Sequence, residues 1–460
     1  MAPRPLIPLL DKLLCEIPRS YRLPPFAAGS PLYQAGAATA LAVVIEQARR
    51  KMAAGGVPDA VLQSRFVRAL AQMLRDAMDT ERGDPVFQAM VLRHRSPIVR
   101  EYAALATSGK SDSRQIRSAV NRFAHAARLQ RMPPGALCDT LARLQIHVFH
   151  ADWLQLAQAV QHALNMPQAA EDASLRHGLQ GLQHNPALER LQRVQRLEAD
   201  DLVQHYQSLW SQRGPSSGSA SAAAQGQVSR QIGVEVEERA RQALEILVDR
   251  LNTEASDAAF YCVVSSMRVP ASIAADWDRA KTEWDVVLLR RAQGADRSAL
   301  WDVCLLVEAK ASVDASTTDL PRLLRGVRLL ARADPTATYP FETRDGIVHL
   351  RGTSLHALTT QETDLRRMVL YCCNAPAGNA VRLLSAAARM QLLSAPASLA
   401  FACELAGGCE PDPAMLAGLW HDLLHSVQWQ AVLHQYPSLH LVRELMVHTD
   451  DLLSAAGGGA

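Results

Sequence analysis

The stretch that decides the fold of the C-terminal half is Glu283-Trp284-Asp285-Val286-Val287-Leu288-Leu289, followed after a break by Leu305-Leu306-Val307-Glu308-Ala309-Lys310. Both parts are apolar and rich in branched side chains, which predicts two strands in the core of a sheet. Each part nevertheless carries charges that a buried strand avoids unless they are paired or bound to a metal. Because a strand alternates its faces, Glu308 and Lys310 should lie on one face, with Asp285 on the neighbouring strand. An acid beside an acid-x-lysine pattern suits a metal ion, a water molecule and a phosphate group.

The composition bounds the class of protein. A chain of 460 residues predicts two or three domains, and 48% apolar with 20% charged residues predicts a globular protein. The net charge of +2 excludes a global polycation, so any contact with nucleic acid must be a local patch. The eight cysteines form no C-x-x-C pair, and several lie in apolar runs, which suits a reducing compartment.

No targeting or membrane segment is expected. The N-terminus carries three prolines and then charges, and so lacks the apolar segment of a signal peptide. The longest early apolar stretch, residues 35–45, is too short to span a bilayer. We expect a cytoplasmic protein without a membrane partner, although an effector delivered by a dedicated machine would have the same features.

The hydrophobic pattern changes once along the chain. Residues 1–211 have a helical pattern throughout, which predicts an all-α N-terminal domain for binding or targeting. Residues 212–227 are small and mostly uncharged, which predicts a flexible linker. We expect an α/β domain over residues 228–410 and a helical C-terminal extension over residues 411–460.

The α/β domain is predicted to begin with a helix, three strands, a helix and a strand. The expected elements are a helix over 228–251, strands over 260–264, 284–289 and 303–307, a helix over 320–331, a strand over 368–373, a helix over 381–393 and a last strand over 399–403.

The charged residues match the chemistry of phosphodiester hydrolysis. That reaction requires a nucleophilic water, neutralisation of developing charge and a proton for the leaving oxygen, and Mg²⁺ supplies the first two with a few carboxylates and waters as ligands. Asp285 and Glu308 are the candidate ligands. Lys310 would orient or activate the attacking water, and Ser312 would continue the same face.

These residues resemble the PD-(D/E)xK nuclease superfamily, with Asp285 as the first acid and Glu308-Ala309-Lys310 as the (D/E)xK element. The resemblance covers roughly residues 228–405 and implies a restriction-endonuclease-like mixed-sheet core flanked by helices. It implies a nuclease with DNA as the expected substrate, Mg²⁺ or Mn²⁺ as cofactor, and a role in defence, repair or as a toxin. Trp284 stands where the family often has proline.

The family often adds a glutamate from the preceding helix, and this chain offers Glu235, Glu237 and Glu238. Glu237 shares a helical face with the apolar residues Ala240, Leu244 and Leu247, which favours it as a third metal ligand and catalytic residue.

Arginines near the predicted site are candidates for contact with the nucleic acid backbone. Arg290 and Arg291 begin a long hairpin after the second strand, and Arg322 and Arg325 lie on the following helix. A protein partner could bind through the N-terminal helical domain.

Three alternatives remain open from the sequence. Asp285, Glu308 and Lys310 could form a closed ion pair in a non-catalytic nucleic-acid- or protein-interaction protein with a degenerate nuclease fold. His421 and His425 have a spacing able to share zinc, but the glutamate of the metalloprotease motif is absent, which favours solvent-exposed or helix-packing histidines.

The third alternative concerns the basic run of residues 110–131, with six Lys or Arg against one Asp. It could be a nucleic-acid stripe or the solvated face of an amphipathic helix.

Overall fold

The structure is a computed structural model that describes residues 7–23, 36–212, 220–254, 260–273, 279–292, 300–376 and 382–458. The chain divides into two compact units. The sheet unit comprises Met1–Met73, Ser217–Leu392 and Leu416–Ala460, and the helical unit comprises Leu74–Ser216 and Leu393–Met415. Residues 1–211, predicted as one domain, are thus divided between the two units.

The described part of the helical unit contains only helices. They are α4 (Pro85–Arg95), α5 (Pro97–Ala106), α6 (Gly109–Ala124), α7 (Ala126–Leu129), α8 (Ala136–Phe149), α9 (Trp153–Leu164), α10 (Pro167–Glu171), α11 (Ala173–Gln183), α12 (Pro186–Leu197), α13 (Asp201–Ser211) and α19 (Pro396–Ala406). Many begin at a side-chain cap, as where Asp152 accepts from the Gln155 amide at the start of α9. The prediction of a helical pattern before residue 211 is therefore confirmed for the described residues.

The helix α19 lies where a strand was predicted. Residues 399–403 were expected to form a last strand, and that expectation was wrong. Pro396 occupies the first turn of α19, where its fixed φ and missing N–H favour a helix start. A short apolar run does not distinguish a buried strand from a buried helix segment.

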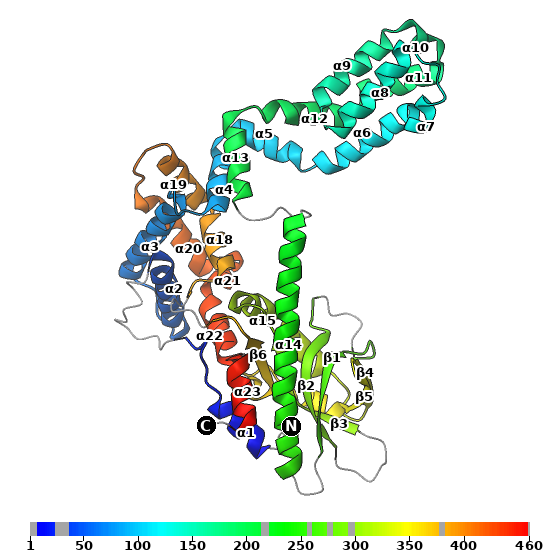
Figure 1. Ribbon diagram of the computed structural model, residues 1–460. Helices are drawn as coiled ribbons and strands as arrows, with labels where there is room; N and C mark the ends of the chain where they lie inside the picture. Colours follow the sequence, from blue (N-terminus) through cyan, green and yellow to red (C-terminus); the bar gives the residue numbers. More distant parts are fainter. Residues whose placement is uncertain are drawn as a thin grey trace. The chain divides into compact units, whose positions relative to one another are not determined.

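The sheet unit combines seven described strands with flanking helices (Figure 1). The strands are β1 (Tyr261–Arg268), β2 (Glu283–Arg291), β3 (Leu300–Ala309), β4 (Thr338–Thr343), β5 (Gly346–Arg351), β6 (Val369–Cys373) and β7 (Met446–His448). The helices are α1 (Pro8–Glu16), α2 (Ala37–Ala53), α14 (Ala220–Glu254), α15 (Val313–Leu330), α16 (Gly352–His356), α17 (Glu362–Met368), α20 (Ala417–His425), η3 (Val427–Trp429), α21 (Gln430–Leu433), α22 (Gln435–Leu445) and α23 (Thr449–Gly457). Three further helices include a boundary between the units: α3 (Ala60–Met78), α18 (Ala386–Leu393) and η2 (Pro413–Leu416).

The strand β3 organises the sheet. The strands β1, β2 and β3 are antiparallel neighbours, and pairing through β5 and β4 closes these five strands into a small barrel. The second half of β3 instead pairs in parallel with β6, and β6 pairs in parallel with β7. The mixed α/β class is therefore confirmed. The closed barrel was not expected.

Each face of this sheet is covered by helices, which explains the unbroken apolar runs of β2 and β3. One face packs Val287 and Leu306 against Leu323 and Val327 of α15. The other face packs alternate residues of β2 and β3, such as Val286, against α1, α14 and α23. Asp285 and Glu308 continue the row of residues that faces α15.

Two other segments differ from expectation. Within the predicted linker, residues 220–227 form the first turns of α14, since alanine is the strongest helix former, and residues 213–219 lie outside the described residues. The predicted helical extension over residues 411–460 contains β7, which completes one edge of the sheet. Among the described residues, no helix combines the length and the apolarity needed to cross a bilayer.

Candidate functional site

Asp285 and Glu308 lie side by side where β2 and β3 pair. Val286 opposes Val307 in the antiparallel ladder, so Asp285 and Glu308 are the next pair along it and share one face. Oδ2 of Asp285 accepts a hydrogen bond of 2.8 Å from the backbone amide of Ala309. The register of the two strands therefore brings the predicted carboxylates together.

Glu308 is the buried centre of the site. Its side chain is 0% exposed, and its Oε2 lies 2.6 Å from Nζ of Lys281 and 3.2 Å from Nζ of Lys310. Its Oε1 is also buried and has no hydrogen-bond partner among the described residues. The two ammonium groups thus contact the same carboxylate oxygen, and neither contacts the other oxygen. A buried polar atom without a partner destabilises the fold.

Lys310 is held from the other side by α15. Its Nζ lies 3.3 Å from Oδ2 of Asp319, and the hydroxyl of Tyr371 on β6 donates to the same oxygen at 3.2 Å. The helix begins early enough to supply Asp319 because Ser312 caps it by accepting from the amide of Ala315. Ser312 therefore serves as a helix cap.

Burial and charge shift the titration of these groups. Burial, and then the negative charge of Asp285, raises the pKa of Glu308 to about 8, although Lys281 and Lys310 oppose the shift. Burial by itself would lower the pKa of Lys310, but the carboxylates of Glu308, Asp319 and Asp285 outweigh it and raise this pKa. Perturbed groups of this kind cluster at functional sites.

Glu237 approaches the site from α14, which packs on the opposite face of the sheet. Its side chain is partly buried, whereas Glu235 and Glu238 are exposed. Burial and then the charge of Asp285 raise the pKa of Glu237, with Arg344 acting in the opposite direction. Within the described residues Glu237 makes no hydrogen bond or ion pair, so the structure places it near Asp285 without joining it to the cluster.

The four arginines predicted to contact nucleic acid differ in their exposure and in their partners. Nη2 of Arg290 lies 3.6 Å from Oδ2 of Asp302, while Arg291 is exposed at the end of β2. Arg322 is exposed on α15, and Arg325 donates two hydrogen bonds to a backbone carbonyl, that of Arg279. Most of the hairpin after Arg291, residues 293–299, lies outside the described residues.

Sequence reasoning missed Lys281, Asp319 and Tyr371. Lys281 precedes β2 by two residues and lies four residues before Asp285, so it carries no strand pattern of its own. Asp319 belongs to the part of α15 that precedes the predicted helix start at residue 320. Ser312 after β3 is a signal for the start of a helix. Had the predicted helix begun there, it would have included Asp319 as a candidate site residue.

The donor set fits a divalent cation only in part. Among the described residues, no group of three or more His, Cys, Asp or Glu side chains is placed to hold a metal ion. Mg²⁺ keeps several waters and often uses one or two carboxylates, which Asp285 and the unpartnered Oε1 of Glu308 can provide. His421 and His425, expected to be solvent-exposed or helix-packing histidines, are exposed on α20.

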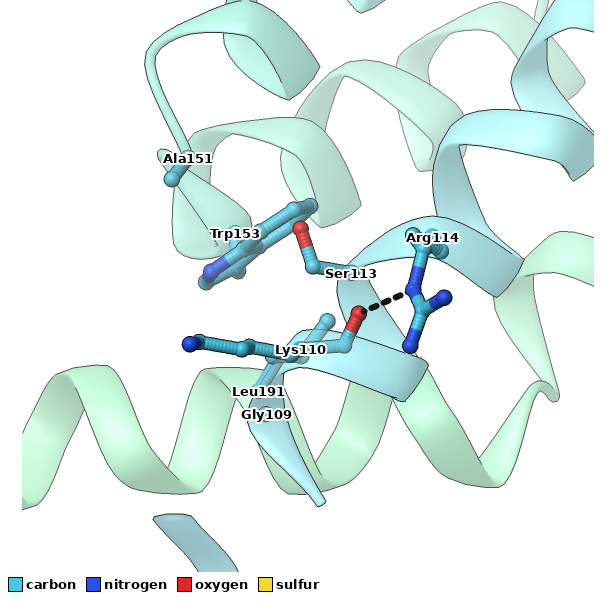
Figure 2. Close-up of a pocket in the computed structure, with 7 residues that line it drawn as sticks. All are labelled: Gly109, Lys110, Ser113, Arg114, Ala151, Trp153 and Leu191. Carbon is cyan, nitrogen blue, oxygen red and sulfur yellow. Dashed lines mark hydrogen bonds between the residues drawn. The ribbon is translucent and has the colours of Figure 1, made fainter. Parts of the chain in front are cut away.

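The helical unit carries a separate pocket of about 510 Å³ (Figure 2). It is lined by Gly109, Lys110, Ser113, Arg114, Ala151, Trp153 and Leu191. Lys110 and Trp153 extend toward the same side, whereas Arg114 folds back so that its Nε donates to the Lys110 carbonyl at 3.2 Å. Because Lys110, Arg114 and Arg117 are exposed on α6, the pocket adjoins a basic surface.

No protein-family model, curated protein or solved structure matches this chain.

Proposed function

We propose that this protein is a metal-dependent nuclease that hydrolyses phosphodiester bonds, with DNA as the expected substrate. Asp285 and Glu308 would hold Mg²⁺ or Mn²⁺, and Glu237 would add a more distant carboxylate. A bound divalent cation supplies Lewis acidity and a nucleophilic hydroxide near neutral pH. Lys310 would orient the attacking water and offset phosphate charge, while Asp319 and Tyr371 keep its ammonium in place.

The observation that carries the proposal is the Glu308 carboxylate. It is fully buried beside a second carboxylate, with a lysine two residues along the chain and one oxygen unpartnered. A purely structural ion pair would be expected to satisfy both oxygens, because an unpartnered buried polar atom costs about 1–3 kcal/mol. A site with spare donor capacity suits a ligand that binds there.

The order of elements also supports the resemblance to PD-(D/E)xK nucleases. The candidate residues lie on the predicted succession of a helix, three strands, a helix and a strand, which α14, β1, β2, β3, α15 and β6 form. In the structure β1, β2 and β3 are antiparallel neighbours, and β6 is parallel to β3. The strands β4 and β5, which close the barrel, are an addition to this order.

One observation favours the second candidate, a non-catalytic interaction protein that keeps a nuclease-like fold. Lys281 and Lys310 both contact Oε2 of Glu308, which is the closed ion-pair arrangement expected of a structural cluster. The two candidates differ in one measurable property, since only the first requires affinity for a divalent cation.

The experiment is a cleavage assay with the full chain on single- and double-stranded DNA and RNA, with Mg²⁺, Mn²⁺ or a chelator. We expect Glu308→Gln and Lys310→Met to lower cleavage at least 100-fold, because each removes a group assigned to metal or water. Glu342→Gln, the same change on an exposed strand residue, is the matched control. Cleavage by Glu308→Gln at the wild-type rate would remove the proposed nuclease site.

A further inference from the structure

Lys281 is the feature that the proposed mechanism leaves without a role. Its side chain is only 5% exposed. Its Nζ lies 2.6 Å from Oε2 of Glu308, 3.7 Å from Oδ1 of Asp285 and 5.8 Å from the ring centre of Trp284. A buried lysine needs a counter-ion, and this one contacts the two carboxylates that the proposed function assigns to the metal.

The backbone around Lys281 is held in place by α15. The Lys281 amide donates to the carbonyl of Arg322 at 3.2 Å, and Arg325 donates to the carbonyl of Arg279. Arg279 itself has a φ of 63°, an uncommon left-handed conformation for a residue other than glycine. Gly326 allows the close approach, because a Cβ there would lie 2.7 Å from Cβ of Lys281. Several independent contacts therefore fix the backbone of Lys281 at a position from which its side chain reaches the carboxylates.

The two lysines of the site differ in what else they contact. Lys310 has a second acidic partner, Asp319, which is not a proposed metal ligand. Lys281 has only Glu308 and Asp285 as acidic partners within ion-pair distance among the described residues. A cation that binds these two carboxylates would therefore take both partners of Lys281 and leave Lys310 with Asp319.

We propose that Lys281 is a built-in counter-ion that competes with a divalent cation for Asp285 and Glu308, and that it weakens metal binding by this chain. In the metal-free protein its ammonium neutralises the carboxylates. On metal binding its flexible four-carbon stem lets the ammonium withdraw while the backbone stays clamped to α15. This inference rests on the metal ligands of the proposed function, and it assigns to Lys281 the control of their affinity.

The test is a titration of the full chain with Mn²⁺ by calorimetry, comparing wild type with Lys281→Met and Lys281→Gln. Methionine keeps the apolar stem without charge, and glutamine also keeps an N–H donor, so a folded variant is available if one change alone disrupts packing. We expect Mn²⁺ to bind either variant at least tenfold more tightly than wild type. We also expect Mn²⁺ to raise the melting temperature of the variant by more than that of wild type.

Arg328→Met is the matched control, because it removes one exposed positive charge from α15 without touching a carboxylate, and its Mn²⁺ affinity should stay within about twofold of wild type. Equal or weaker Mn²⁺ binding by the folded Lys281 variants overturns the inference, even if wild type cleaves nucleic acid. If the Lys281 variants bind Mn²⁺ more tightly but neither wild type nor any variant cleaves nucleic acid, the inference stands and the nuclease proposal is removed. Absence of Mn²⁺ binding in all variants removes both.

Discussion

At Glu308, one carboxylate must satisfy opposing demands. Its burial favours the neutral form, while Lys281 and Lys310 favour the ionised form. A hydrophobic residue at this position of β3 would avoid the conflict, as Val307 and Leu306 do beside it. Retaining an ionisable group where burial opposes its charge is an arrangement found at sites that work by exchanging a proton or a metal ion.

The first prediction concerns pH. Because the pKa of Glu308 is raised to about 8, its carboxyl is protonated in a growing fraction of molecules as the pH falls below 8, and a proton there competes with a metal ion. Mn²⁺ affinity should therefore rise by up to about tenfold per pH unit from pH 6 to pH 8 and level off above it, measured by calorimetry. Glu308→Gln should abolish this dependence. A wild-type affinity that stays constant over this range would contradict the assignment.

At the scale of elements, α15 does more than cover the sheet. It presents Asp319 to Lys310, accepts a hydrogen bond from the Lys281 backbone and leaves space for that backbone at Gly326. Each contact depends on where the helix begins, and Ser312 sets that point. The site is thus assembled between the ends of two strands and the helix that follows them.

The second prediction is that Gly326→Ala destabilises the sheet unit and disturbs the site. The added methyl would lie 2.7 Å from Cβ and 2.9 Å from the carbonyl oxygen of Lys281, which forces the two segments apart. We expect a loss of about 1–3 kcal/mol, typical of overpacking, measured by urea denaturation.

Gly418→Ala on α20 is the control, since a Cβ there meets nothing within 4 Å. It should leave stability unchanged or raise it by up to about 1 kcal/mol, because alanine favours the helix. Equal stability of the Gly326 variant and wild type would show that Lys281 is not tightly packed against α15.

At the scale of the whole molecule, the charged groups of interest belong to two different units. The buried carboxylates and lysines lie in the sheet unit, and the exposed cations of α6 lie in the helical unit. Lys110, Arg114 and Arg117 follow one another at helical spacing and have no acidic partner among the described residues. A chain with net charge of only +2 would need such a local surface to bind a nucleic acid backbone.

The third prediction is that this surface binds nucleic acid independently of the proposed metal site. Replacing Lys110, Arg114 and Arg117 by alanine should weaken DNA binding about tenfold or more at low salt. If each contacts one phosphate, the slope of log affinity against log salt should fall by about 2 to 3.

Fluorescence anisotropy at several salt concentrations measures the effect. The control is a variant with alanine at Lys12, Arg65 and Arg68, which removes the same charge from the sheet unit. Neither triple variant should change the affinity for Mn²⁺. An unchanged salt slope would identify the α6 face as a solvated helix surface.

Local sequence pattern was informative wherever periodicity governs the structure. Strand alternation predicted that Asp285, Glu308 and Lys310 come together, and helical phase singled out the partly buried Glu237 over its exposed neighbours. The main strands of the sheet and the helices of the N-terminal half were predicted for the same reason, because side-chain periodicity is a property of neighbouring residues.

Tertiary structure alone decided which distant segments complete the site and the sheet. Lys281, Asp319 and Tyr371 reach the cluster from a loop, a helix and a later strand, and β7 adds to the sheet from a segment read as helical. Closure of the barrel likewise depends on the pairing of β4 with β1 and of β5 with β3, across segments that contain α15 and other strands. Such contacts leave no period in the sequence, because they arise from packing between segments far apart in the chain.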